Sequence, residues 1–135
     1  MKKNNLFNLR KKTAFVFGGN GLLGKEISKI LNIYGAKVVV LDLNFDKEIK
    51  NEAIFFEKFN VSKLNSIDSQ IKKITNKHGC PNIMINASYP RSKDWSKSSF
   101  DKITIKSLKE NVDMHMNSYA WLTIKFANLM KKKKI

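Results

Sequence analysis

A cluster of glycines directly after a short apolar segment limits the folds open to this sequence more than any other feature. Lys12 to Phe17 reads as a buried β-strand, and the segment Gly18-Gly19-Asn20-Gly21-Leu22-Leu23-Gly24 follows it at once. The apolar residues that come next recur at intervals of three and four, and Gly35 stands where the resulting helix is expected to stop. The pattern predicts a strand, a tight turn and a helix that starts at the glycines.

The rest of the chain repeats this alternation of strand and helix. Three more strands are predicted at Ala36 to Leu41, Ala53 to Phe59 and Asn82 to Asn86. The stretch from Asn44 to Glu52 has room for a short helix. Alternating strands and helices of this spacing pair in parallel through right-handed crossovers. We therefore expect an α/β fold with a doubly wound parallel sheet of about four strands, in one domain over residues 1–135.

Two helices are predicted in the second half of the sequence. Ser62 is placed to cap the first, which is expected to end near His78 and Gly79 because Pro81 follows. The second is expected to be one long helix that turns a continuous apolar stripe to the core. The residues of that stripe are Leu108, Val112, His115, Tyr119, Leu122, Phe126 and Leu129.

The strong positive charge invites a nucleic-acid partner, but its distribution argues against one. The formal net charge is +15, yet only Arg10 and Arg91 are arginines, and the lysines are scattered among asparagines and isoleucines. The final lysine run, Lys131 to Lys134, reads as a solvated helix end. We therefore predict no nucleic-acid partner, with charge-driven binding kept as a competing hypothesis.

Cysteine content and hydropathy bear on the cellular compartment. Cys80 is the single cysteine, so no internal disulfide can form, and no Cys/His cluster with metal-ligand spacing accompanies it. No run of eighteen apolar residues occurs, and the N-terminus lacks the pattern of a secretory signal. We expect a cytoplasmic protein with no metal site and no membrane span.

The glycines and one carboxylate indicate a ligand that contains a diphosphate. Gly18, Gly21 and Gly24 would let the chain turn sharply and leave backbone N–H groups facing a diphosphate at the positive end of a helix. Asp42 ends the second predicted strand about twenty residues beyond the glycines, where dinucleotide-binding folds place the carboxylate that accepts the ribose hydroxyls. Its charge would repel a 2′-phosphate, which favours NAD over NADP. The alternative is that the glycines form an ordinary turn, that Asp42 only ends a strand, and that no ligand binds there.

In these residues the sequence resembles the N-terminal, NAD(P)-binding part of the short-chain dehydrogenase/reductase family, from about Lys12 to Met130. The family has a glycine loop, an acidic strand end, an Asp-Val after the third strand and an Asn-Asn-Ala-Gly after the fourth. The resemblance implies a set of cofactor-binding residues. These are Gly18, Gly19, Asn20, Gly21, Leu22, Leu23, Gly24, Asp42, Leu43, Asn60, Val61, Asn86, Ala87 and Ser88.

The sequence departs from the family pattern at several of these places. Phe17 stands before the first glycine, where the family often has a threonine whose hydroxyl braces the loop. Asn60 replaces the aspartate of Asp-Val but keeps an acceptor for the adenine amino group. Ile85 and Ser88 alter the fourth-strand motif.

The resemblance places most of the catalytic residues outside this sequence. The family's Ser and Tyr-x-x-x-Lys follow a fifth strand, and the sequence ends at Ile135 before either, as a truncated family member would. Tyr89 and Lys93 match the Tyr-x-x-x-Lys letters, but Pro90 makes the required helical turn improbable. His115 falls at the family's catalytic Asn, where a proton relay and a histidine satisfied within the core are both open.

Two functions remain open at this stage. The first is an NAD(P)-dependent oxidoreductase that transfers a hydride at a carbonyl or hydroxyl group, with this chain as its cofactor-binding part. Its small-molecule substrate would be sugar-derived if the Tyr-Pro-Arg after Asn86-Ala87 reflects similarity to family members tied to surface-glycan or flagellin modification. The second is a noncatalytic nucleotide-binding or interaction protein, or a decayed gene product. In either case we expect a homo-oligomer through the C-terminal helix.

Overall fold

A computed structural model describes residues 7–44, 53–97 and 99–135 and places a four-stranded parallel sheet at the centre. The strands lie in the order β3-β2-β1-β4, so β1 is central and hydrogen-bonds to both β2 and β4. The first six elements are β1 (Thr13–Phe17), α1 (Leu22–Ile33), β2 (Lys37–Asp42), β3 (Ile54–Lys58), α2 (Ile67–His78) and β4 (Ile83–Asn86). The predicted α/β fold with a parallel sheet is confirmed.

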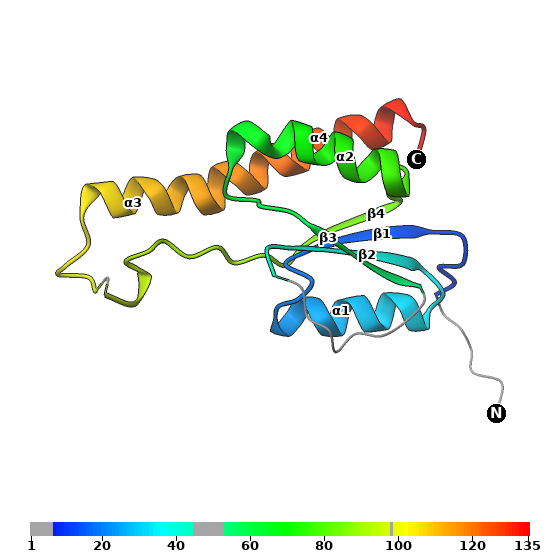
Figure 1. Cartoon of the computed structure of the whole chain (residues 1–135), viewed down its shortest axis with the longest axis horizontal. Coiled ribbons are helices and arrows are strands. Elements are labelled where there is room, and N and C mark those ends of the chain that lie inside the picture. Colours follow the sequence, from blue (N-terminus) through cyan, green and yellow to red (C-terminus); the bar gives the residue numbers. More distant parts are fainter. Residues whose placement is uncertain (1–6, 45–52, 98) are drawn as a thin grey trace.

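Helices cover both faces of the sheet and give it two cores (Figure 1). Helix α1 lies on one face, over a cluster that includes Val16, Val38 and Val40. Helix α2 and the C-terminal helix α4 (Ser118–Lys132) lie on the other face, over a cluster that includes Phe15 and Phe17. Successive side chains of a strand point to opposite faces, so the buried positions of β1 and β2, Ala14 to Phe17 and Val38 to Leu41, must all be apolar to fill both clusters.

The helix after β3 begins later than the sequence predicted. A single 3-10 turn, η1, covers Leu64–Ser66, and the α-helix starts at Ile67 after Ser66, whose side chain makes no capping bond. Ser62 therefore does not cap it. The end was predicted correctly, since α2 stops at His78 and Gly79 follows with a φ of 84°.

The C-terminal region is not one regular helix with a single core-facing stripe. Helix α3 (Ile105–Val112) is followed by a π-helical turn, η3 (Asp113–Asn117), and then by α4. Leu122 and Phe126 are buried against the sheet, whereas Leu108 is 48% exposed. Figure 1 shows the reason, because α3 extends beyond the sheet and has no strand beneath it. The expectation that the whole stripe faces the core was wrong for its N-terminal half.

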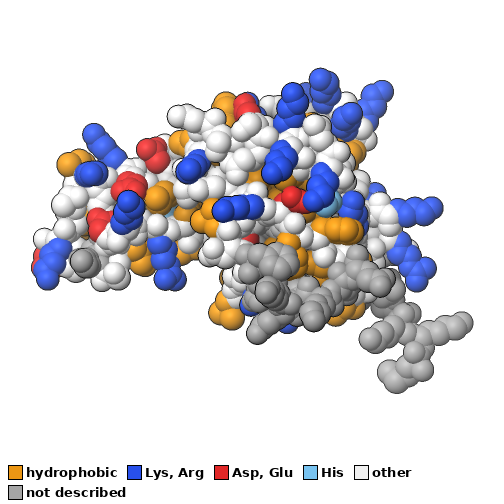
Figure 2. Space-filling view, in the orientation of Figure 1, with side chains coloured by type: hydrophobic (Ala, Val, Ile, Leu, Met, Phe, Trp, Pro, Cys, Tyr) orange, Lys and Arg blue, Asp and Glu red, His pale blue; other side chains and the backbone are white. Residues whose placement is uncertain are grey.

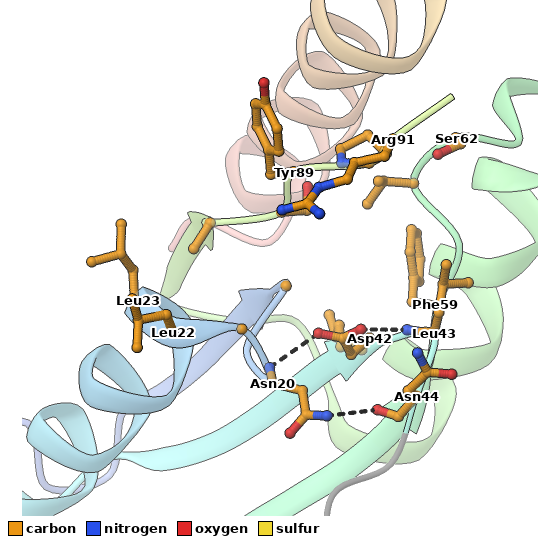
Figure 3. A pocket seen from close by; sticks show the side chains of 17 residues that line it. Asn20, Leu22, Leu23, Asp42, Leu43, Asn44, Phe59, Ser62, Tyr89 and Arg91 are labelled. Carbon is orange, nitrogen blue, oxygen red and sulfur yellow. Dashed lines mark hydrogen bonds between the residues drawn. The ribbon is translucent and has the colours of Figure 1, made fainter. Parts of the chain in front are cut away.

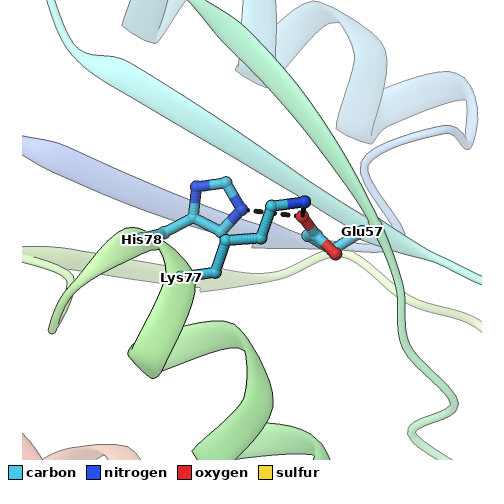
Figure 4. Close-up of polar contacts among 3 residues, drawn as sticks. All are labelled: Glu57, Lys77 and His78. Carbon is cyan, nitrogen blue, oxygen red and sulfur yellow. Dashed lines mark hydrogen bonds and ion pairs between the residues drawn. The ribbon is translucent and has the colours of Figure 1, made fainter.

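A buried ion pair joins the edge strand β3 to the end of α2. His78 Nε2 lies 2.8 Å from Glu57 Oε1, and Lys77 Nζ lies 2.5 Å from the same oxygen (Figure 4). The side chains of Glu57 and His78 are 12% and 4% exposed. Burial raises the pKa of Glu57, but hydrogen bonds and charges from Lys77 and His78 outweigh it, so the pKa lies below its usual value.

Charge and hydropathy can be placed on the described surface. Lys and Arg side chains are spread over the visible face from α3 to the C-terminal end, in no single patch (Figure 2). Among the described residues, no helix is both long and apolar enough to cross a membrane. The short helix considered at Asn44 to Glu52 falls outside the described residues, apart from Asn44.

Candidate functional site

The glycine segment forms the turn that connects β1 to α1. Gly18 leaves β1 with a φ of +67°, a conformation that suits glycine, and its N–H donates to the carbonyl of Leu41. Gly21 N–H then donates back to the carbonyl of Gly18, 3.0 Å away, which closes the turn at the start of α1. Helix α1 has no side-chain cap and no acidic residue in its first turn. Its first N–H groups are therefore available to an anion.

Two of these glycines are required because other backbone segments pass too close for a side chain. A Cβ on Gly18 would lie 2.5 Å from the Cα of Ser88, so the turn packs directly against the end of β4. A Cβ on Gly24 would lie 2.1 Å from the carbonyl oxygen of Gly18. The turn thus fits against β4 and α1 only as glycine, and the space above it stays open.

Asp42 lies at the end of β2 beside this turn. Its Oδ2 accepts from the backbone N–H of Asn20 at 3.0 Å, and its Oδ1 accepts from the N–H of Leu43 at 2.7 Å. These two bonds fix the carboxylate between the turn and the strand end. Each carboxylate oxygen has a further lone pair, so the fixed group can accept hydrogen bonds from two neighbouring hydroxyls.

A cavity of about 590 Å³ opens at the carboxyl ends of β1, β2 and β4, over the glycine turn (Figure 3). Figure 3 shows Asn20 and Asp42 on one side of it and Tyr89 and Arg91 on the other. Ten predicted cofactor-binding residues line it: Gly18, Asn20, Gly21, Leu22, Leu23, Asp42, Leu43, Val61, Ala87 and Ser88. Open parallel sheets bind ligands at this edge, where the strand order reverses.

The other four predicted residues support the cavity from behind its walls. Gly19 and Gly24 are buried beneath the turn. The side-chain oxygen of Asn60 accepts from the N–H of Ser62 within a turn and keeps a second lone pair. Asn86 Oδ1 accepts from both the N–H and the hydroxyl of Ser88, at 3.1 and 2.5 Å. Asn86 therefore shapes the end of β4.

Sequence reasoning missed several residues that line the cavity: Leu41, Asn44, Phe59, Ser62, Tyr89, Pro90 and Arg91. Phe59 could have been found, because it ends the third strand just as Asp42 ends the second. Its ring packs edge-on against the ring of Phe17, with the two ring centroids 4.9 Å apart. The Phe17 ring therefore fills the space beside the glycine turn. Pro90 and Arg91 follow β4 in a segment without regular structure, for which the sequence pattern gave no direction.

A second cavity, of about 430 Å³, adjoins the first, and Tyr89 lines both. Its other lining residues are Trp95, Ile103, Asn111 and His115. Tyr89 lies between the rings of Trp95 and His115, at centroid distances of 5.5 and 4.8 Å. His115 is half-buried and faces this cavity. Lys93 is exposed and Tyr89 lies outside any helix, so the Tyr-x-x-x-Lys letters form no helical pair.

Hydrogen bonds fix which nitrogen of His115 carries a proton when the ring is neutral. The Tyr119 hydroxyl donates to the Ser88 carbonyl, 2.5 Å away, and a carbonyl can only accept. His115 Nδ1 lies 3.2 Å from the same hydroxyl and must therefore be its donor. Nε2 is left with a free lone pair, which can accept a proton or a hydrogen bond. Burial raises the pKa of Tyr119, although the bond to Ser88 opposes this, so its phenol stays protonated.

No group of three or more His, Cys, Asp or Glu side chains within the described residues could hold a metal ion.

Comparisons with known proteins agree with this geometry. The family model for short chain dehydrogenases matches residues 12–135. Post-translational flagellin modification protein A of Campylobacter coli is 24% identical over 134 residues, which cover 92% of this chain and 52% of that protein. The chain thus spans about half the length of the curated relative it matches.

Solved structures share the fold at low sequence identity. A short chain dehydrogenase from Leptospira borgpetersenii with bound NAD+ superposes with a TM-score of 0.80 at 20% identity, over 98% of this chain and 51% of that one. The structure of gox2181 gives a TM-score of 0.78 at 17% identity, over 94% and 51% of the two chains. The fold, the cavity at its carboxyl edge and the family model that covers all but the first residues lead to one conclusion: this chain belongs to the short-chain dehydrogenase family.

Proposed function

We propose that this chain binds NAD in the cavity over the glycine turn and forms the cofactor-binding part of an NAD-dependent oxidoreductase. The observation that carries the proposal is the fixed Asp42 carboxylate beside an uncapped helix N-terminus. The helix end suits a diphosphate, and the carboxylate suits the two ribose hydroxyls of the adenosine half. A 2′-phosphate would bring negative charge against Asp42, which supports NAD over NADP.

The residues present fit this cofactor. Gly18 and Gly24 let the turn pack directly against the end of β4 and the start of α1 beneath the cavity, and Asp42 needs no rearrangement to accept two hydroxyls. Val61 and Phe59 offer apolar surface for a planar base at the Asp42 end of the cavity. When bound, the nicotinamide ring would accept a hydride from an alcohol carbon or return one to a carbonyl carbon.

The test of NAD binding is a direct titration. Asp42→Ala is expected to weaken NADH binding at least tenfold, because two ribose hydroxyls lose a charged acceptor. Asp42→Asn keeps the shape of the side chain and one neutral acceptor, so its NADH affinity is expected to lie between those of the parent and Asp42→Ala. The measurement is NADH fluorescence on binding, with the exposed Asp68→Ala as a matched control. Equal affinity of Asp42→Ala and the parent would contradict the proposal.

We further propose that the second cavity receives the small-molecule substrate. Aromatic rings at Tyr89 and Trp95 can pack on the apolar face of a sugar-derived ring, and His115 Nε2 can accept a hydrogen bond from a hydroxyl. In an oxidation, His115 would take the proton of that hydroxyl as the hydride leaves the carbon. The name of the Campylobacter coli relative supports a surface-modification pathway. We expect His115→Phe to bind the substrate more weakly than the parent does and to bind NADH equally well.

Partners and compartment are proposed from the described surface. Trp121 and Ile124 on α4 are 40% and 49% exposed, which supports a homo-oligomer through the C-terminal helix. A monomer in light scattering at high concentration would contradict this. Cys80 has no disulfide partner, which favours the reducing cytoplasm. The family match favours the oxidoreductase over a noncatalytic nucleotide-binding protein.

A further inference from the structure

One charged side chain in the cofactor cavity belongs to none of the residues that the sequence pattern assigned. Arg91 lies in the segment after β4 and projects into the cavity opposite Asn20 and Asp42 (Figure 3). Among the described residues that line this cavity, Arg91 carries the single positive charge and Asp42 the single negative one. The guanidinium therefore gives the cavity a positive charge that attracts anions.

Arg91 makes no hydrogen bond or ion pair with any described residue. Asp42, on the other side of the cavity, forms no ion pair with Arg91 and is held by the backbone N–H groups of Asn20 and Leu43. Asp94 is the nearest acid along the chain, and it is engaged elsewhere. Hydrogen bonds from Ser92 and Ser107 hold the pKa of Asp94 below its usual value. The five donors of Arg91 are thus left for a ligand.

The residues next to Arg91 hold the backbone that presents it. Pro90 precedes it and fixes one backbone torsion. Ser92 follows it and is 4% exposed, and the Ser92 hydroxyl accepts from the side-chain amide of Asn111 on α3. Asn111 is itself tied to the carbonyl of Ser107 at 2.8 Å. Pro90 and the anchored Ser92 restrict the backbone at Arg91, which lowers the entropy lost in ordering this segment when the arginine binds an anion.

We propose that Arg91 binds the diphosphate of the dinucleotide from the side opposite the glycine turn. This inference rests on the proposed NAD binding. The glycine turn and the first N–H groups of α1 supply partial charges from below, and they leave the outer phosphate oxygens open to solvent. A guanidinium supplies a full charge and paired N–H groups that match two phosphate oxygens. The cavity thereby holds its anion between a helix end and a cationic side chain.

The experiment compares ligands that contain different parts of the dinucleotide. In the 135-residue chain, Arg91→Gln is expected to weaken binding of NADH and of ADP-ribose about tenfold, while adenosine binding stays as in the parent. Arg91→Lys keeps the charge but not the paired donors and is expected to lose less. The difference between parent and Arg91→Gln should shrink as salt increases, because screening weakens the charge. Lys93→Gln, two residues away on the exposed side, is the matched control.

Each remaining outcome overturns the inference in a distinguishable way. Unchanged NADH and ADP-ribose affinity in Arg91→Gln, in a parent whose binding depends on Asp42, would refute the role of Arg91 alone. A loss confined to NADPH would mean that Arg91 contacts a 2′-phosphate, and an equal loss for adenosine would mean that it shapes the cavity without binding phosphate. A parent that binds neither NADH nor ADP-ribose would overturn the proposed function as well. Thermal unfolding of each variant checks that the fold is intact.

Discussion

The two walls of the cofactor cavity are built on different principles. The glycine turn on one wall is held by backbone contacts so close that side chains are excluded at Gly18 and Gly24. The opposite wall, from Ala87 to Arg91, has no regular structure. It is positioned by side chains of the helices, because Tyr119 on α4 donates to the Ser88 carbonyl and Asn111 on α3 donates to the adjacent Ser92 hydroxyl. A wall made of backbone tolerates few substitutions but needs few partners. A wall made of side chains can change its chemistry while the fold stays the same.

The largest expected effect tests the backbone wall. Gly24→Val would place a Cβ 2.1 Å from the Gly18 carbonyl, so the turn must shift. We expect a loss of about 3 kcal/mol in the free energy of unfolding and loss of NADH binding. Gly21→Ala is the matched control, because its φ is −75° and its nearest contact is 3.2 Å. Chemical denaturation measures both variants, and a Gly24→Val protein as stable as Gly21→Ala would show that the wall is not rigid.

An intermediate effect is expected where the second wall attaches to α4. Tyr119→Phe removes the hydroxyl that donates to the Ser88 carbonyl and accepts from His115. Loss of a partly buried hydrogen bond costs about 1 kcal/mol in the free energy of unfolding. The same change frees His115 to turn, so its ring signals in NMR should broaden. Tyr34→Phe, on the opposite side of the sheet, serves as the control. Unchanged His115 signals in Tyr119→Phe would show that the Tyr119 hydroxyl does not hold the His115 ring in place.

The smallest of the three effects is expected beneath β3, at Glu57, where neither wall contributes, and it is present at neutral pH and disappears in acid. The folded-state pKa of Glu57 lies below its unfolded value, so its carboxylate stabilises the fold above about pH 4.3, and this stabilisation is lost as the pH falls through the folded pKa. Glu57→Gln should therefore flatten the acid limb of the melting temperature against pH. Glu26→Gln removes a surface pair with Lys29 and should leave the limb unchanged.

The difference between the walls also decides what the sequence could predict. The positions of the strands, the glycine turn and Asp42 follow from local patterns, since a turn needing glycine and a strand needing apolar residues are fixed within a few neighbours. The sequence pattern gave no direction for the segment from Tyr89 to Ser92, because its course depends on contacts with Asn111 and Tyr119, which lie about twenty to thirty residues away. Asn60 was assigned to the cofactor by resemblance; in the structure it lies outside the cavity lining and its side-chain oxygen accepts from the N–H of Ser62.

The same reasoning explains the mistaken stripe on the last helix. Periodicity shows which side chains share a face but not how far the sheet extends beneath them. Leu122 and Phe126 on α4 are buried in the cluster that contains Phe15 and Phe17, whereas Leu108 is exposed on α3, and α3 extends beyond the sheet. The π-helical turn at Asp113–Asn117 also adds a residue to the repeat, so the face changes between α3 and α4.

The contact between the glycine turn and the end of β4 restricts how this site can vary over evolution. The Cα of Ser88 occupies the volume that a Cβ on Gly18 would need, and the carbonyl of Ser88 is bonded to Tyr119. These are backbone atoms that any residue at position 88 would keep, so no substitution of Ser88 makes room for a side chain at position 18. A library randomised at both positions should therefore return glycine at position 18, whichever residue stands at position 88. Diversity in this cavity is expected to accumulate one step further along the chain, at Tyr89 and Arg91.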